Sequence, residues 1–244
     1  MLQLLVLMVH GKSSLIKLIS GLLVPKSGNV YIDCVDTKNK KEAKGIRKKV
    51  GIVFQNPENQ LVFSSIEDDM KFMLENFDFD KTEISKRIEE SLKMVEMEEY
   101  RNKDIYALSM GQKQRIAVAE MLALRPRYLV LDEPTAMLDP VSKNKLIQTI
   151  KKLKKEYKIT VIYVTNVIQE ILNADRIIAL DKGSIIFECT PKSIIKNIEN
   201  FKKIGLEIPD TIKLIDGLNK KGISINKDNF DIEMIINEIA KKVL

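Results

Sequence analysis

Two adjacent carboxylates, Asp132 and Glu133, follow directly after the apolar run Leu129–Leu131. Three consecutive apolar residues are typical of a short strand that is buried on both faces, as in a parallel sheet. Open α/β sheets bind their ligands at the carboxyl ends of such strands. One carboxylate there could hold a metal ion through water, and the other could orient or deprotonate an attacking water molecule. An ordinary strand that ends in two solvated acids would have the same sequence.

A second candidate site is the tripeptide Gly11-Lys12-Ser13, which separates an apolar run beginning at Leu2 from an apolar-periodic segment beginning at Leu15. Strand, glycine turn and helix are the parts of a phosphate-binding loop, whose backbone N–H groups and helix N-terminus bind phosphate. The lysine would reach the β- and γ-phosphates, and the serine would bind magnesium. The complete pattern needs a glycine five residues before Gly11, where this chain has Val6, so the motif is partial.

Two further polar residues stand at the ends of predicted elements. Gln55 follows the apolar run Val50–Phe54, and Ser109 precedes a predicted helix that continues to Leu124. A glutamine at the end of a central strand can reach a metal ion or water, or it can face solvent from a loop. Ser109 is a suitable N-cap, and the N–H groups behind it could bind an anion, although a capped helix without a ligand fits equally well.

The 244 residues are enough for one large α/β domain or for a domain with an appendage, and a composition of 45% hydrophobic and 30% charged residues allows a packed core. No apolar run approaches the roughly 20 residues of a membrane span, and the start lacks the basic region of a signal peptide. The formal charge of +6 comes mostly from scattered lysines, which fit solvated helix faces better than nucleic-acid binding. A mildly basic surface would also suit an anionic membrane leaflet. Cys34 and Cys189 are expected to be free thiols.

The periodicity of apolar residues predicts the remaining elements. A helical lobe is expected over about 66–107, and an amphipathic appendage over 205–244. The other predicted strands are Asn29–Asp33, Val50–Phe54, Thr160–Thr165, Arg176–Leu180 and Ser184–Glu188, and the other predicted helices are Val141–Tyr157 and Ile232–Val243. Asp181-Lys182-Gly183 is predicted to close a hairpin.

In this order the motifs resemble those of the ATP-binding subunits of ABC transporters. More narrowly, the chain is similar to the ATPases of energy-coupling-factor (ECF) importers, the cobalt, nickel and vitamin uptake type. The five motifs cover nearly the whole chain, and together they are far more specific than any one of them. The matches are Gly11–Ser14 for the end of Walker A, Gln55 for the Q-loop, Leu108–Gln112 for the ABC signature, Tyr128–Glu133 for Walker B and Ala136–Pro140 for the D-loop.

The resemblance implies the fold and the site. The fold would be a P-loop NTPase core with a mostly parallel sheet in residues 1–204, a helical subdomain at about 66–124 within it, and a C-terminal helical appendage at 205–244. Two such subunits would enclose two ATP molecules. The residues implied for nucleotide binding are Gly11, Lys12, Ser13, Ser14, Ser109, Gly111, Gln112 and Asp139. Those implied for Mg²⁺ are Ser13, Gln55 and Asp132, and those implied for catalysis are Glu133, Gln55 and Asn166.

The resemblance also implies partners. These are a second ABC ATPase subunit, identical or different, a transmembrane coupling subunit that docks near Gln55 and the helical lobe, and a membrane subunit that binds the transported substrate. The chain would then lie at the cytoplasmic face of the cell membrane as a peripheral subunit, and no nucleic acid would be bound.

Several departures from the family fall on the chemistry. Val6 replaces the first Walker A glycine, Met110 replaces the first signature glycine, and Asn166 stands at the position of the switch histidine. The only histidine of the chain is His10. Losing one preorganised donor costs transition-state stabilisation, so a weak or inactive ATPase is expected. The short start together with scattered motif changes also fits a coding sequence that is truncated at its N-terminus or decaying.

Three functional hypotheses follow. The leading one is the ATPase motor of an ECF-type importer with impaired activity, favoured by the intact Asp132 and Glu133. The second is a non-catalytic nucleotide-binding or scaffold partner in an asymmetric ATPase pair, or a decayed copy, favoured by Asn166, Met110 and Val6. The third, a soluble ABC-type ATPase that acts on nucleic acid, lacks a coiled-coil insertion and a basic surface with interleaved aromatic residues.

Overall fold

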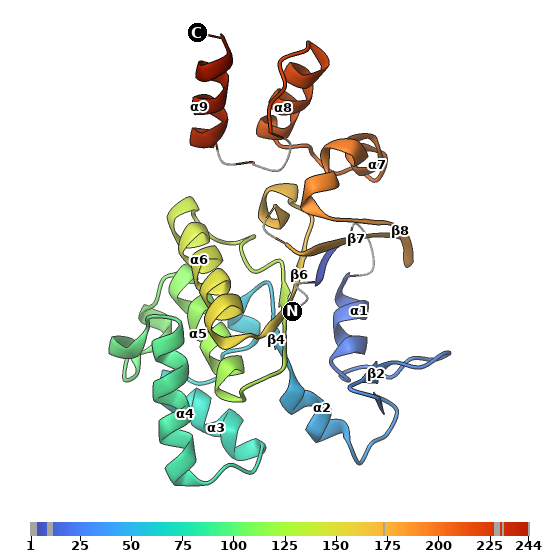
Figure 1. Cartoon of the computed structure of the whole chain (residues 1–244). Helices are drawn as coiled ribbons and strands as arrows, with labels where there is room; N and C mark the ends of the chain where they lie inside the picture. Colours follow the sequence, from blue (N-terminus) through green and yellow to red (C-terminus); the bar gives the residue numbers. More distant parts are fainter. Residues whose placement is uncertain (1–3, 9–11, 173, 227–229, 231, 244) are drawn as a thin grey trace. The chain divides into compact units, whose positions relative to one another are not determined.

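The computed structural model describes residues 4–8, 12–172, 174–226, 230 and 232–243 of the chain (Figure 1). These residues form two compact units. The first unit runs from Lys12 to Val164, and the second contains the N-terminal strand and the chain from Thr165 onward. Each unit is described by itself below.

The first unit is built on parallel strands. β4 (Val50–Val53) pairs with β5 (Tyr128–Asp132), and β5 pairs with β6 (Thr160–Thr165), both in parallel. All four residues of β4 are buried, as are the three central residues of β5. This confirms the predicted strand before Asp132, because a strand covered on both faces needs a continuous apolar run.

The segment before β4 contains α1 (Lys12–Ile19), a two-stranded hairpin of β2 (Tyr31–Ile32) and β3 (Val35–Asp36), and α2 (Ala43–Lys49). The hairpin turn is made by Asp33 and Cys34, whose φ values are both positive at 46° and 66°. Two successive positive φ values are typical of a type I′ turn, which explains why this position favours glycine. The predicted buried strand at Val50–Phe54 is confirmed by β4, but residues 43–49, for which no helix was predicted, form α2. Only Ile46 of this helix is buried, and basic residues in the last turn stabilise a helix C-terminus.

A helical lobe follows β4 in the chain. It contains α3 (Ile66–Asn76), α4 (Lys81–Met94) and α5 (Met110–Ala123), with short 3₁₀ turns at η1 (Pro57–Asn59), η2 (Glu98–Tyr100) and η3 (Ile105–Ala107). The predicted helical segment over 66–124 is therefore helical in the structure. The apolar residues that recur every three or four positions in α4 are buried, as an amphipathic helix requires. α6 (Pro140–Tyr157) follows β5 and begins one residue before its predicted start.

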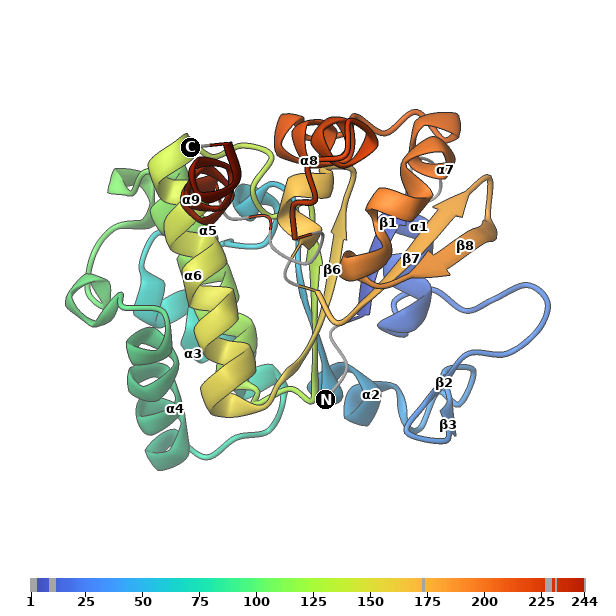
Figure 2. The same cartoon turned by 45° about the horizontal axis from the view of Figure 1, so that its top comes forward.

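The second unit has a mixed arrangement of strands. β1 (Leu4–Met8) pairs in parallel with β7 (Arg176–Asp181), which pairs antiparallel with β8 (Ser184–Cys189). Lys182 and Gly183 have φ values of 49° and 79°, so the predicted hairpin turn is confirmed. The helical elements of this unit are η4 (Ile168–Ile171), η5 (Pro191–Ser193), η6 (Ile195–Asn197), α7 (Ile198–Lys203), α8 (Asp210–Lys220) and α9 (Ile232–Val243), of which Figure 2 labels the three α-helices.

The stretch 205–244 contains α8 and α9 as its helices, and α9 has its predicted bounds. A separate appendage that begins at residue 205 remains a prediction. Within the described ranges, every helix falls short of the length or the apolar character that a bilayer crossing requires.

Candidate nucleotide and magnesium site

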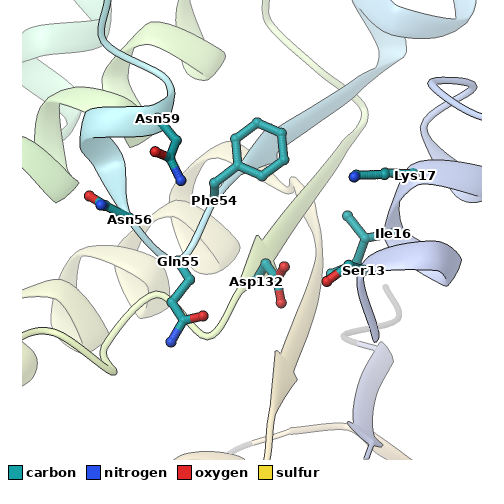
Figure 3. Close-up of a pocket in the computed structure, with 8 residues that line it drawn as sticks. All are labelled: Ser13, Ile16, Lys17, Phe54, Gln55, Asn56, Asn59 and Asp132. Carbon is teal, nitrogen blue, oxygen red and sulfur yellow. The ribbon is translucent and has the colours of Figure 1, made fainter. Parts of the chain in front are cut away.

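Three residues predicted to bind magnesium line one cavity of the first unit, with a volume of about 390 Å³ (Figure 3). Ser13 comes from the first turn of α1, Gln55 from the loop after β4, and Asp132 from the end of β5. Figure 3 shows Ser13 and Asp132 facing each other, with Gln55 reaching in from the other side. The parallel pairing of β4 with β5 explains this meeting, because both strands end at the same edge.

Lys12 and Glu133 form an ion pair beside this cavity. Both side chains are mostly buried, with 16% and 17% of their surface exposed. The backbone of Glu133 is left-handed, with a φ of 44°, and its N–H donates a hydrogen bond of 2.9 Å to the carbonyl of Val164. A residue other than glycine in this conformation is strained, and such strain concentrates at functional sites. The turn therefore directs the carboxylate toward the lysine that begins α1.

The residues present fit a magnesium ion. Burial raises the pKa of the Asp132 carboxyl above its usual value, the neighbouring Glu133 adds to this, and Lys12 opposes it. A carboxylate, a hydroxyl and an amide carbonyl are hard oxygen ligands, and Mg²⁺ in phosphotransfer sites is bound by one or two carboxylates together with substrate phosphates. In the ranges that the structure describes, no three His, Cys, Asp or Glu side chains come together as a protein-only metal cluster.

The signature segment starts α5 with a capping box. The Ser109 hydroxyl accepts from the Gln112 N–H, and the Gln112 side chain accepts from the Ser109 N–H at 2.8 Å. The other end of the Gln112 amide donates to the Tyr100 hydroxyl at 3.0 Å. Gly111 is buried against α6, where an added Cβ would lie 2.5 Å from the side chain of Ser142. The predicted helix start is confirmed, and the glycine is required by this close approach.

The loop that contains Gln55, from Phe54 to Gln60, contacts α5 through an ion pair and hydrogen bonds. Lys113 pairs with Glu58 at 2.5 Å, and Gln114 donates to the Phe54 carbonyl at 3.1 Å. At the end of the loop, the Gln60 amide donates to Glu120 at 2.8 Å. These bonds join the strand end that carries Gln55 to the helix that carries the signature.

Glu120 is an acid held inside the helical lobe. Burial raises its pKa to about 8, and the nearby Asp69 carboxylate adds to this shift. Asp69 is itself buried, and its pKa is raised by desolvation, although it accepts hydrogen bonds from the N–H groups of Val62 and Phe63 at 2.8 Å. Glu120 is therefore protonated near neutral pH, which could not be predicted from the sequence because the residue stands in an ordinary helical pattern.

Three other residues were predicted to bind nucleotide, and the structure describes two of them, Ser14 and Asp139. Gly11 lies outside the described residues, as does His10, and Ser14 is exposed on α1. Asp139 caps α6 by accepting from the N–H groups of Val141 and Ser142 at 2.9 and 3.0 Å. Hydrogen bonds from Ser142 lower the pKa of Asp139.

The structure also describes the three residues that depart from the family, Met110, Val6 and Asn166. Met110 is the first residue of α5. Val6 is in the middle of β1, paired with Ile178, so the strand continues through the position of the missing glycine. Asn166 is exposed just after β6 in the second unit, where the neighbouring Thr165 hydroxyl donates to Glu170 at 2.8 Å.

Three polar residues that line the cavity, Lys17, Asn56 and Asn59, were not predicted from the sequence as site residues. Lys17 is four residues after Ser13 on α1, a spacing that places both on one face of the helix, so this signal was present. Asn59 belongs to η1, whose turn depends on a hydrogen bond from the Glu58 N–H to the Asn56 side chain.

The sequence of this chain is similar to those of known proteins. The family described as "ABC transporter" matches residues 10–136. The energy-coupling factor transporter ATP-binding protein EcfA1 of Caldanaerobacter subterraneus is 46% identical over 231 residues, which are 95% of this chain and 83% of that protein.

Two solved structures are also similar. The cbiO1 protein of Clostridium perfringens, part of the ABC transporter complex cbiONQ, has a TM-score of 0.72 and 32% identity over 87% of each chain. The dimeric ATP-binding cassette MJ0796, bound to ADP and phosphate, has a TM-score of 0.67 and 32% identity over 77% of this chain and 84% of that one. The chain belongs to the ABC transporter family, among the ATP-binding subunits of energy-coupling-factor transporters.

Proposed function

We propose that this chain binds MgATP and hydrolyses it slowly to power an ECF-type importer. The observation that carries the proposal is the cavity that brings Ser13, Gln55 and Asp132 together beside the Lys12–Glu133 ion pair. The cavity has the oxygen ligands, the cation and the carboxylate that phosphoryl transfer to water requires.

Each of these residues has a distinct task in the proposal. Lys12 leaves Glu133 and binds the phosphates of the nucleotide, which frees the Glu133 carboxylate to orient the attacking water. Ser13, Asp132 and Gln55 hold Mg²⁺, which when bound neutralises charge that develops on the phosphate oxygens. The N-terminus of α1 adds a partial positive charge on the same side as Lys12.

Slow turnover is proposed because Val6, Met110 and Asn166 depart from the residues of the family. Asn166 can hydrogen-bond but cannot accept and return a proton as histidine does. Met110 adds a side chain at the start of α5, where the family has glycine. Removing one preorganised donor from a hydrolytic site costs about 2.7–4 kcal/mol of transition-state stabilisation.

The proposed partners are a second ATPase subunit and a transmembrane coupling subunit, with a further membrane subunit that binds the transported substrate. The related MJ0796 cassette is dimeric, which supports the first. For the second, a helix of the coupling subunit is proposed to occupy an apolar cavity of about 170 Å³. Its walls come from α2, β4, α5, the loop after β4 and the residues that directly follow α1 and α3, and they include Leu22, Ile52, Phe54, Phe77, Met121 and Leu124. The chain would thus lie at the cytoplasmic face of the membrane.

The test is a titration of the purified chain with ATP, with and without Mg²⁺, while hydrolysis is followed in the same samples. An Asn166→His variant is measured alongside. We expect nucleotide binding by both proteins, and an increase in turnover of about 10²-fold or more for the variant, which regains a side chain that can accept and return a proton. Ordinary turnover by the unaltered chain would refute the slow-turnover proposal, and no binding by either protein would refute nucleotide binding itself.

A second candidate function is a non-catalytic partner in an asymmetric pair of ATPases. Met110 and Asn166 favour it, because they alter the two segments that act on the γ-phosphate in the family. The intact Glu133 favours hydrolysis, since a scaffold has no use for the carboxylate. Binding that persists while Asn166→His gains no turnover would favour the scaffold.

A further inference from the structure

The positive charge of the chain is concentrated in one stretch. Residues 17–49 contain nine Lys or Arg against three Asp or Glu, a net charge of +6. The formal charge of the whole chain is also +6, so the remaining residues balance to zero. Of these nine cations, Lys17 lines the nucleotide cavity and the other eight do not.

Contacts within the first unit hold this stretch together. The Lys38 ammonium donates to the Gly28 carbonyl at 2.7 Å, and the Thr37 N–H donates to the Val30 carbonyl at 2.9 Å. Ile46 of α2 packs against Gly21 at the end of α1, where an added Cβ would lie 3.2 Å away. Figures 1 and 2 show α1, the β2–β3 hairpin and α2 on one side of this unit.

Six exposed cations of this stretch form what we call the basic face: Lys26, Lys38, Lys40, Lys41, Lys44 and Arg47. Lys44 pairs with Asp78, but no described residue forms an ion pair with Lys26, Lys40, Lys41 or Arg47. Asp33 does not offset these charges, because it is half-buried and engaged with Lys49, Arg127 and the Tyr128 hydroxyl. Hydrogen bonding from Tyr128 is the main reason that its pKa is lowered.

An apolar tip adjoins the basic face in the chain. Leu22, Leu23 and Val24 are 44%, 45% and 55% exposed. They follow α1 directly, where the N–H groups of Leu22 and Leu23 both donate to the Lys17 carbonyl at 2.9 Å. Three consecutive exposed aliphatic side chains beside exposed cations match the two layers of a lipid surface, with headgroups outside and acyl chains beneath.

We propose that the basic face and the apolar tip contact anionic phospholipid headgroups of the membrane. An anionic leaflet attracts clustered lysines. Each lysine near its surface raises the partitioning of the protein onto the membrane about fivefold. Nucleic acid is a poorer match, because binding of single strands depends on aromatic stacking, and Tyr31 is the only exposed aromatic residue within 17–49. The inference rests on the proposed function in one respect: Leu22 and Arg47 also line the cavity assigned to the coupling helix, so the face would border that subunit.

The experiment is co-sedimentation of the full chain with vesicles, without nucleotide or partner. One set contains phosphatidylglycerol and phosphatidylcholine in equal amounts, and the other contains phosphatidylcholine alone. The test variant is Lys40→Gln/Lys41→Gln, and the matched control is Lys151→Gln/Lys155→Gln on α6, which removes the same charge from a different helix. A third variant, Leu23→Ser/Val24→Ser, tests the apolar tip, and circular dichroism confirms that all variants are folded.

We expect binding to the anionic vesicles only, reduced about 25-fold by Lys40→Gln/Lys41→Gln and little by the control. Binding should weaken with added salt, because exposed charges are screened. Equal binding to both vesicle types, an equal loss in the control, or tighter binding to single-stranded RNA than to the anionic vesicles would overturn the proposal. None of these outcomes affects ATP binding, so failure here is distinct from failure of the proposed function.

Discussion

The ammonium of Lys12 is bound to the carboxylate of Glu133, although the two residues are 121 positions apart in the chain. One begins the helix α1, and the other follows the end of β5. Both are largely shielded from water, so their charges are screened less than those of an exposed ion pair. A nucleotide phosphate must compete with Glu133 for Lys12. Breaking this ion pair therefore lowers the affinity of the site for nucleotide.

Replacing Glu133 by glutamine should tighten nucleotide binding and remove turnover. The amide releases the lysine ammonium, while it keeps the shape of the side chain. We expect affinity for ATP to rise about tenfold, equal to about 1.4 kcal/mol, when measured by titration with a fluorescent nucleotide. Glu156→Gln, at an exposed position on α6, is the control. Weaker binding by Glu133→Gln than by this control would show that the pair does not compete with phosphate.

Replacing Asp132 by asparagine should remove the effect of Mg²⁺ on nucleotide affinity. The variant keeps a hydrogen-bonding oxygen, but it loses the buried negative charge that would stabilise a divalent cation. We expect ATP affinity without Mg²⁺ to stay within about twofold, while the gain produced by Mg²⁺ falls about tenfold. Asp80→Asn, exposed before α4, is the matched control. A full Mg²⁺ effect in Asp132→Asn would exclude this carboxylate from the metal site.

Replacing Gly111 by alanine should destabilise the fold, because its methyl group would overlap the side chain of Ser142. The expected loss in free energy of unfolding is about 1–3 kcal/mol, measured by urea denaturation. A second change, Ser142→Gly, should recover much of this loss in a double-mutant cycle. Gly217→Ala on α8 is the control, because nothing lies within 4 Å of its added Cβ, and it should be neutral or stabilising. Equal behaviour of the two alanine variants would contradict the close contact.

Replacing Glu120 by glutamine should change how stability depends on pH. Because the pKa of Glu120 is raised to about 8 from an ordinary value of 4.5, the folded chain retains a proton between these values that the unfolded chain has lost. The free energy of unfolding should therefore fall as pH rises through this window, by up to about 1.4 kcal/mol per pH unit. Glu120→Gln should remove this contribution, and Glu89→Gln, exposed on α4, should not. Parallel stability curves for all three proteins between pH 5 and 8 would contradict a buried proton.

Much of the fold could be predicted from local sequence alone. β6 and α9 have their predicted bounds, because a run of β-branched residues and a 3.6-residue period are local signals. α2 was missed, because its single buried residue leaves no apolar period to detect. The order of five short motifs was enough to place the chain in its family.

Which of these residues meet depends on how distant elements pack. Local sequence indicates only the chemistry available, namely a lysine and a serine at a helix start, two acids after a buried strand, and a glutamine after another. Parallel pairing then brought Gln55 and Asp132 to the same edge, and folding set Lys12 against Glu133. Contacts such as Gly111 with Ser142, and the buried proton on Glu120, depend on packing between elements that are distant in the chain. Local propensity carries no information about such distances, because burial and charge coupling exist only after the elements have packed together.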